Sequence, residues 1–544
     1  MLVANYAHKG SPYQHQIEGV HFAYGKDFFA LFMEMATGKS KLLIDVVSNL
    51  FLEGKIDAVM LIVPNGLQDQ WATEQLATHS PVPYETLVFK SGKSEKRFSE
   101  YHGFLKRKSR KVLRWYIVNV EAFSHDTYLG EFRLFLKENE VFLAIDEASK
   151  IKNLDASRTG NIIQGLAELT RLGKRVVACK PLSKYRAVMT GTPVTNNPFD
   201  LYAIFEFLKP GYFGMTFSAF KSRYGLQKMD HVPGSGKQFQ RKLSLKELKG
   251  IRDTASKGVD RPRIAQFFGV SVTDVDYIVD NPGVTVPFKN LGELKAVIAP
   301  YSFVKKKVDC LDLPEKVFEK VYVEMGADQK RLYRELCADM MAKFGGTELT
   351  VANSLTLLVR LSQVTSGLFP EAEGEGTALI GTNPKIEAML DKMEDSGEVP
   401  AIVLGRFVHE VKHAADMIRK RFPDYNVRLV IGEVGMDERK EIIDDFKAGN
   451  VDVLVATQRT IGMGFNLQKA SVCYFLSNTY SMDDRAQTED RIHRPGQTAE
   501  KCTYIDFLAK GTLDERVYTV LQEKKDLLEY MRGKRVDEFL GGGK

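Results

Sequence analysis

Short apolar runs alternate with longer amphipathic segments in the first part of the chain. Between residues 28 and 225 these runs are 57–64, 114–120, 141–147 and 185–191. Each is short and partly β-branched, as is typical of strands buried on both faces of a parallel sheet. Helix-length segments separate the runs, so the pattern predicts a doubly wound α/β lobe.

The same alternation returns near the end of the chain. Its apolar runs are 400–407, 427–433, 451–457, 471–477 and 501–508. They predict a second α/β lobe. Between the lobes, residues 232–242 are rich in glycine and cations and no strand rhythm follows, which indicates an insertion. Residues 327–366 suggest long helices interrupted at Gly345 and Gly346.

These patterns predict four parts of the chain. The expected parts are an N-terminal lobe (1–225), a mainly helical insertion (226–290), a helical linker region (291–383) and a C-terminal lobe with a closing helix (384–544).

Composition narrows the class of protein. The chain has 544 residues, a formal net charge of +6 and five cysteines without a C-x-x-C pair. A disulfide framework or a zinc site is therefore not expected. The start of the chain does not resemble a signal peptide, and no apolar run is long enough for a membrane span. We expect a soluble intracellular protein, in the cytoplasm or, for a viral protein, in the host cytoplasm. The mild positive charge neither requires nor opposes a nucleic-acid partner.

A phosphate loop is predicted where an apolar run meets an amphipathic helix. Thr37, Gly38, Lys39 and Ser40 follow the apolar run 28–32 and precede a helical pattern. In such a loop the lysine contacts the β- and γ-phosphates and the serine hydroxyl holds Mg²⁺. The motif alone is equally compatible with an ordinary helix start at the surface.

Two adjacent carboxylates favour the nucleotide interpretation. Asp146 and Glu147 end the buried run 141–147, at the edge of a parallel sheet where ligands bind. Asp146 is expected in the Mg²⁺ shell, and Glu147 is expected to orient the attacking water. The alternative, a solvated turn at the end of a strand, is less favoured because the phosphate loop stands upstream.

The segments 146–153 (DEASKIKN), 189–197 (MTGTPVTNN) and 487–497 (QTEDRIHRPGQ) together resemble the Swi/Snf family of DNA translocases, within helicase superfamily two. The length resembles compact bacterial and bacteriophage members. The resemblance implies two RecA-like doubly wound lobes in tandem, ATP and Mg²⁺ as cofactors, and double-stranded DNA bound through sequence-independent phosphate contacts. The family does not keep the first glycine of the phosphate loop, so Met33 at that position is ordinary. Ala36 replaces a family glycine, and Ser149 stands where the family usually has histidine.

The resemblance also assigns roles to individual residues. The implied catalytic residues are Lys39, Asp146, Glu147, Arg491 and Arg494, with Ser40 and Asp146 holding the metal. The implied ATP-binding residues are Gln16, which reads the adenine edge, Ala36, Thr37, Gly38, Lys39, Ser40, Lys41, Gly464 and Gln487. The implied residues for nucleic-acid contact or coupling are Pro64, Asn65, Trp71, Thr190, Gly191, Thr192, Thr457, Gly462 and Asn466. A positioned arginine is worth about 10³–10⁵ in phosphoryl-transfer rate, so Arg491 and Arg494 make the second lobe part of the catalytic site.

Two other segments have open interpretations. The stretch 104–114 carries six cations and is either a phosphate contact or a solvated loop. Residues 261–279 have a helix-turn-helix pattern, but the second helix carries Asp274, Asp276 and Asp280 and no cation, which disfavours base reading. We expect a small three-helix module that packs on a lobe or binds a protein, with the basic segment 237–249 as the better phosphate contact.

The leading functional hypothesis is a DNA-dependent ATPase that translocates on duplex DNA, in replication, repair, recombination or removal of bound proteins. One alternative is a motor that acts on a protein such as RNA polymerase, with DNA as its track. A third is a binding module that uses ATP only to change shape, which the intact catalytic motifs disfavour.

Overall fold

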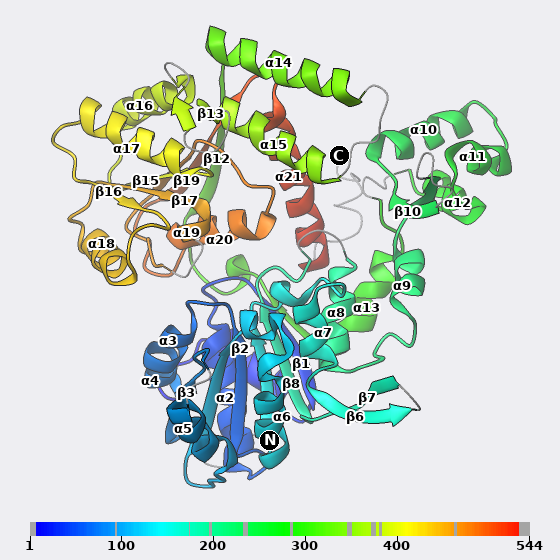
Figure 1. The fold of residues 1–544 in the computed structure, drawn as a ribbon, viewed down its shortest axis with the longest axis vertical. Coiled ribbons are helices and arrows are strands. Elements are labelled where there is room, and N and C mark those ends of the chain that lie inside the picture. The colour runs from blue at the N-terminus through cyan, green and yellow to red at the C-terminus, as the bar shows by residue number, and fades with distance from the viewer. Residues whose placement is uncertain are drawn as a thin grey trace. The chain divides into compact units, whose positions relative to one another are not determined.

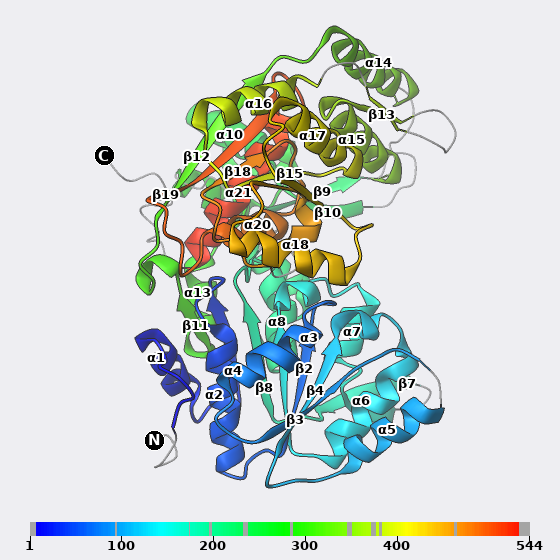
Figure 2. The ribbon, with the colours of Figure 1, turned by 90° about the vertical axis from the view of Figure 1, so that its left-hand side faces the viewer.

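The structure is a computed structural model, and it describes residues 7–92, 95–172, 175–194, 198–231, 238–282, 287–344, 351–370, 377–379, 383–461 and 465–532 (Figures 1 and 2). The chain divides into two compact units. The first unit comprises Met1–Cys310 and Asp526–Lys544, and the second comprises Leu311–Lys525. Each unit contains one large sheet, and we call the units the first and the second lobe. Among the described helices, none combines the length and the apolar character that crossing a membrane requires.

The first lobe is built on a seven-stranded sheet in the order β11-β1-β8-β5-β2-β4-β3. Every neighbouring pair in it is parallel. The strands are β1 (Phe28–Met33), β2 (Ala58–Val63), β3 (Tyr84–Val88), β4 (Leu113–Asn119), β5 (Val141–Asp146), β8 (Tyr185–Thr190) and β11 (Ser302–Lys305). The four apolar runs predicted to be strands form β2, β4, β5 and β8.

Helices cover both faces of this sheet because its side chains alternate in direction. Phe28, Ala30 and Phe32 of β1 lie in one core cluster, and Phe29, Leu31 and Met33 lie in the other. The first cluster includes α5 (Glu95–Lys106), α6 (Leu129–Glu138), α7 (Ser157–Ile163), α8 (Asp200–Leu208) and α13 (Leu291–Ile298). The second includes α1 (Gln14–Ala23), α2 (Lys39–Leu52) and α4 (Leu76–His79). The predicted doubly wound lobe is confirmed.

The second lobe has a six-stranded sheet in the order β12-β19-β18-β15-β17-β16, also parallel throughout. Its strands are β12 (Glu315–Val323), β15 (Ala401–Gly405), β16 (Val427–Val430), β17 (Val453–Thr457), β18 (Val472–Phe475) and β19 (Lys501–Ala509). One face packs on α16 (Pro384–Ser396) and α17 (Val408–Arg421), and the other on α18 (Met436–Ala448). The five predicted strands of this lobe are all present.

Among the strands that the sequence pattern did not predict are β11 and β12, which lie in the stretch expected to be a helical linker. β11 and β12 extend the first and the second sheet respectively. β12 is an edge strand, and charged residues such as Glu315, Lys316, Glu319 and Lys320 hide its strand character. The same stretch also contains the long helices α14 (Ala327–Phe344) and α15 (Val351–Thr365), as expected.

Smaller elements complete the described chain. Within 226–290 lie a hairpin of β9 (Gln227–His231) and β10 (Gln238–Lys242), which was not predicted, and three helices. These helices, α10 (Leu245–Ser256), α11 (Arg261–Phe268) and α12 (Val272–Asp280), share a core with Leu226 and Leu243. The remaining helices include α3 (Gln68–Gln70), a π-helical turn (Trp71–Gln75), α9 (Phe217–Tyr224), α19 (Gln458–Ile461), α20 (Met482–Ile492) and α21 (Leu513–Arg532). Two further hairpins pair β6 (Ala167–Leu172) with β7 (Arg175–Pro181), and β13 (Leu368–Pro370) with β14 (Thr377–Leu379).

Candidate nucleotide-binding site

The predicted phosphate loop joins β1 to α2 in a tight turn. Ala36 and Gly38 have positive φ angles of 62° and 82°. The Thr37 hydroxyl donates to the Glu34 carbonyl at 2.7 Å, and Nε2 of His15 lies 2.7 Å from the Thr37 carbonyl oxygen. The turn ends where α2 begins, and the free N–H groups of a helix N-terminus favour a phosphate.

Gln16 lies directly against this loop. A Cβ added to Gly38 would lie 1.8 Å from Nε2 of Gln16, so the side chain of Gln16 occupies the space that glycine leaves open. Its Oε1 accepts from the Tyr13 N–H at 2.9 Å. The residue predicted to read adenine is therefore adjacent to the phosphate loop.

The two lysines of the motif have different surroundings. Nζ of Lys39 donates to the carbonyls of Met33 and Glu34 at 2.9 and 3.0 Å, at the end of β1. Nζ of Lys41 is instead buried against Asp45, 2.6 Å from Oδ1. The side chain of Lys41 is thus used within the lobe, and an ATP contact from this residue would have to come from its backbone.

The predicted acidic pair lies at the end of β5. Oδ2 of Asp146 accepts from Nε1 of Trp71 at 2.9 Å, and Oδ1 accepts from the Glu147 N–H at 3.0 Å. Burial raises the pKa of Asp146, while the Trp71 hydrogen bond and the charge of Lys39 oppose the increase. Glu147 adopts a left-handed conformation, with φ 56° and ψ 58°. This backbone conformation is unfavourable for a non-glycine residue, and strained residues of this kind cluster at functional sites.

Sheet order brings these groups together. β1, β8 and β5 are neighbours, and the register pairs Phe32 with Thr190 and Asp146 with Met189. The carboxyl ends of parallel strands meet at one edge of a sheet, where α/β proteins bind ligands.

The coupling segment runs past the phosphate loop at this edge. A Cβ on Gly191 would lie 3.5 Å from the Met33 carbonyl oxygen and from the Met35 nitrogen. The Thr192 N–H donates to the Thr190 hydroxyl at 3.1 Å. The first-lobe residues predicted for ATP and for coupling therefore share one edge.

The donors at this edge fit magnesium. Mg²⁺ prefers hard oxygen ligands, and in nucleotide sites it is usually held by one or two carboxylates together with substrate phosphates. Ser40, in the first turn of α2, offers a hydroxyl, and Asp146 offers a carboxylate oxygen.

The segment after β2 that is predicted to contact nucleic acid has an exposed part and a buried part. Asn65 is exposed, Pro64 is partly exposed, and the Asn65 N–H donates to Oε2 of Glu121 at 3.2 Å. Trp71 is only 2 % exposed and its indole N–H is directed to Asp146. The resemblance predicts that Trp71 contacts nucleic acid, but its side chain faces the protein interior. Nothing in the sequence around Trp71 or around Asp146 predicts that the two residues form a hydrogen bond.

In the second lobe, Arg491 and Arg494 lie at the end of α20 and just after it. Arg491 is 6 % exposed, and Nε of Arg494 donates to the Asp490 carbonyl at 2.8 Å. Burial lowers the pKa of Arg494. Gln487 is partly buried on the same helix. The part of these three residues in ATP binding stays a prediction.

The other predicted second-lobe positions follow β17. Thr457, the last residue of that strand, has its hydroxyl 2.7 Å from the Thr460 hydroxyl. Oδ1 of Asn466 accepts from the Gln468 N–H at 3.3 Å. Gly462 and Gly464 lie outside the described residues.

The basic stretch 104–114 contains structural and exposed cations. Arg114 is fully buried, where it donates to the Phe104 carbonyl at 2.9 Å and to Oδ1 of Asn139 at 2.5 Å. The other five cations of the stretch, Lys106, Arg107, Lys108, Arg110 and Lys111, are exposed. Arg114 is therefore a core residue, and a phosphate contact would have to use the exposed cations.

The helix-turn-helix pattern forms α11 and α12, joined at Gly269 with φ 68°. Arg261 pairs with Asp276 at 2.9 Å and with Asp280 at 2.7 Å, and Asp274 pairs with Lys289. These cations come from outside α12, so the helix itself remains acidic.

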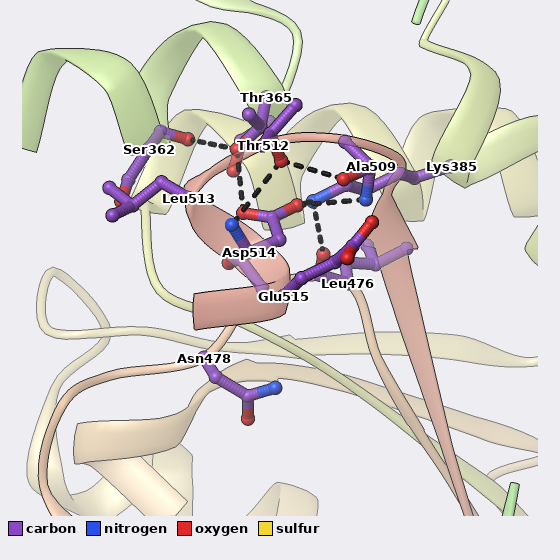
Figure 3. Close-up of polar contacts among 12 residues, drawn as sticks. Ser362, Thr365, Lys385, Leu476, Asn478, Ala509, Thr512, Leu513, Asp514 and Glu515 are labelled. Atoms are coloured by element: carbon purple, nitrogen blue, oxygen red, sulfur yellow. Dashed lines mark hydrogen bonds and ion pairs between the residues drawn. The ribbon is translucent and has the colours of Figure 1, made fainter. Parts of the chain in front are cut away.

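A buried polar network in the second lobe was not foreseen from the sequence. Asp514, at the start of α21, pairs with Lys385 of α16 and accepts from the Thr365 hydroxyl of α15 at 2.9 Å (Figure 3). Lys385 also donates to the Leu476 carbonyl at 3.1 Å. The network therefore holds three helices of the lobe together.

Comparison with known proteins identifies the family. The sequence model described as "SNF2-related domain" matches residues 15–367, well over half of the chain. The chain belongs to the SNF2-related family. A "Helicase conserved C-terminal domain" matches residues 384–496 in the same chain. The family resemblance noted in the sequence is thereby confirmed, and the two parallel sheets agree with the predicted pair of α/β lobes.

Known relatives of this SNF2-related chain are distant. It is 21 % identical to the CHD3-type chromatin-remodeling factor PICKLE of Arabidopsis thaliana, over 96 % of this chain and 34 % of that protein. It is 23 % identical to an uncharacterized ATP-dependent helicase of Mycoplasma pneumoniae, over 74 % of this chain and 32 % of that one. The chain spans about a third of the length of these curated relatives.

Among solved structures, the chain is similar to the Sulfolobus solfataricus SWI2/SNF2 ATPase core in complex with dsDNA. The two are 22 % identical with a TM-score of 0.39, and the match covers 98 % of this chain and 95 % of that one. The predicted enzyme class, an ATP hydrolase of the helicase type, agrees with the matched domains and with the name of the Mycoplasma relative.

Proposed function

We propose that this SNF2-related protein hydrolyses ATP and uses the energy to move along double-stranded DNA. The observation that carries the proposal is the edge of the first sheet where Lys39, Asp146 and Thr190 meet. These residues follow or end the neighbouring strands β1, β5 and β8. A lysine in the phosphate loop after β1 and a carboxylate pair at the end of β5, two strands away in the sheet, form the arrangement needed to bind and cleave a triphosphate.

Each residue has a proposed role at this edge. Lys39 and the N-terminus of α2 bind the phosphates, and Ser40 and Asp146 hold Mg²⁺. The metal supplies charge that stabilises the developing negative charge on the phosphates. Glu147 orients the attacking water and accepts its proton. Gln16 binds the adenine edge.

Arg491 and Arg494 are proposed to complete the site from the second lobe. If the triphosphate needs groups from both lobes, binding brings them together and product release separates them. Pro64 and Asn65 in the first lobe and Asn466 in the second are proposed to contact the DNA backbone, and the buried Thr192 and Thr457 are proposed to couple those contacts to hydrolysis. The cycle of closing and opening would then advance the protein along DNA.

The proposed DNA contacts are to phosphates, which makes binding independent of sequence and sensitive to salt. Such a motor would act in replication, repair, recombination or removal of bound proteins, inside the cell.

The test is an ATPase assay with no DNA, single-stranded, duplex and forked DNA over a range of salt. We expect duplex DNA to stimulate turnover, with stimulation falling as salt rises. Lys39→Ala should abolish turnover, and Glu147→Gln should leave ATP bound but uncleaved. Wild-type turnover by either variant would refute the assignment of the site.

One observation favours a second candidate function, a motor directed to a protein partner. The module of α10, α11 and α12 presents Phe267 with 82 % of its surface exposed, beside an acidic α12. A large exposed aromatic residue suits a protein contact better than a phosphate contact. Deleting residues 232–285 should leave DNA-stimulated ATPase intact and remove displacement of a bound protein if this candidate is correct.

A further inference from the structure

Trp71 lies inside the first lobe, at the junction between α3 and the π-helical turn. Its side chain is 2 % exposed, and Nε1 donates to Oδ2 of Asp146 at 2.9 Å. π-Helical turns are rare and occur frequently at functional sites. The tryptophan is therefore placed to act on the carboxylate that is proposed to hold the metal.

The two hydrogen bonds to Asp146 differ in how well they can fix the orientation of its carboxylate. The Glu147 N–H, at 3.0 Å from Oδ1, belongs to the next residue and moves with it. The Trp71 N–H comes from another element, 75 residues away in the sequence. Of these two donors, only Trp71 can hold the carboxylate relative to the rest of the lobe.

The indole of Trp71 is itself firmly held. Its backbone N–H donates to the Leu67 carbonyl at 3.0 Å, and its ring stacks on that of Trp115 with centroids 6.3 Å apart and an angle of 27°. Trp115 is fully buried on β4. A donor fixed in this way gives the carboxylate one preferred orientation.

We propose that Trp71 is a positioning residue that sets the orientation of the Asp146 carboxylate for Mg²⁺. This inference rests on the proposed function. An ionised carboxylate has about four lone-pair sites, and the two donors described leave sites for a cation. The indole N–H is neutral and donates only, so it orients the carboxylate without replacing or repelling the metal. Partners of this kind, bonded to a metal ligand, typically change metal affinity or activity by about 10–100-fold when removed.

The chain offers a matched control in its other tryptophan. Trp115 belongs to the same core cluster and is also buried, but among the described residues its indole N–H has no hydrogen-bond partner. Trp71→Phe and Trp115→Phe each remove an indole N–H and keep an aromatic ring for the stack, and only the first removes a donor from Asp146.

The experiment measures binding of a fluorescent ATP analogue with Mg²⁺ and with EDTA. For the wild-type protein and for Trp115→Phe we expect Mg²⁺ to tighten binding by the same factor. For Trp71→Phe we expect metal-free affinity close to that of Trp115→Phe, and a tightening by Mg²⁺ that is reduced about tenfold or more. In an Asp146→Ala background, Trp71→Phe should have no further effect on the Mg²⁺ dependence, because the tryptophan acts through that carboxylate.

Equal Mg²⁺ dependence in the two tryptophan variants would overturn the inference, and so would a loss of metal-free binding in Trp71→Phe alone. A further loss of Mg²⁺ dependence in the Asp146→Ala background would also overturn it. Failure of the proposed function gives a different result, since the wild-type protein would then show no Mg²⁺-dependent binding of the analogue.

Discussion

Replacing Asp514 with alanine should destabilise the second lobe strongly. The change leaves the ammonium of Lys385, which is 2 % exposed, without its counter-charge and with the Leu476 carbonyl as its remaining described acceptor (Figure 3). It also removes one of two acceptors of the Thr365 hydroxyl, at 2.9 Å, and the acceptor of the Ala509 N–H, at 3.1 Å. Removing one partner of a buried ion pair costs about 3–5 kcal/mol.

This magnitude can be measured by calorimetry. For units of about 150–250 residues, 1 kcal/mol corresponds to a shift in Tm of about 2–4 °C, so the transition of the second lobe should fall by roughly 6–20 °C. The matched control is Glu433→Ala. Its carboxylate lies 2.8 Å from Lys412, but the two side chains are 65 % and 41 % exposed. An exposed pair of this kind contributes about 0–1 kcal/mol, so the control should change Tm little.

A second variant tests the cause of the loss. Adding Lys385→Met to Asp514→Ala removes the unpaired charge as well, so the double variant should be more stable than Asp514→Ala alone. The reasoning would be refuted if Asp514→Ala lowered Tm no more than Glu433→Ala does, or if the double variant lost the full sum of the two single losses.

Three further substitutions test other parts of the structure. Gly38→Ala should weaken ATP binding at least tenfold in a titration with a fluorescent analogue. A left-handed φ costs a residue that has a Cβ about 1–2 kcal/mol, and the new Cβ would clash with Gln16. Unchanged affinity would contradict this prediction. Glu34→Ala removes the acceptor 2.8 Å from the Lys307 N–H and should lower the stability of the first lobe by about 0.5–1.5 kcal/mol in denaturant unfolding. The control Glu74→Ala, at an exposed position, should have almost no effect. Burial raises the pKa of Glu410 above its ordinary value of 4.5, so between these two pKa values the folded protein holds a proton that the unfolded chain releases. The stability of the protein should therefore fall as pH rises from about 4.5 through the folded pKa. Glu410→Gln should flatten the pH profile of Tm, and a profile unchanged by this substitution would exclude the explanation.

The local pattern of apolar and polar residues was sufficient to predict most of the architecture. Buried runs such as 57–64 and 451–457 became strands of two parallel sheets, because period and apolar content are properties of neighbouring residues. The order of motifs along the chain also indicated the family. An edge strand such as β12 escaped prediction because solvent on its open side allows charged residues that obscure the period.

The sequence by itself determined that Lys39 follows one apolar run, that Asp146 and Glu147 end another, and that their chemistry suits a triphosphate. Only the tertiary structure decided that Trp71 donates to Asp146 and that Lys385 pairs with Asp514, across 75 and 129 residues of sequence. Such contacts form only when the folded elements pack against each other. The residues that surround each partner in the sequence do not indicate which distant residue it will contact.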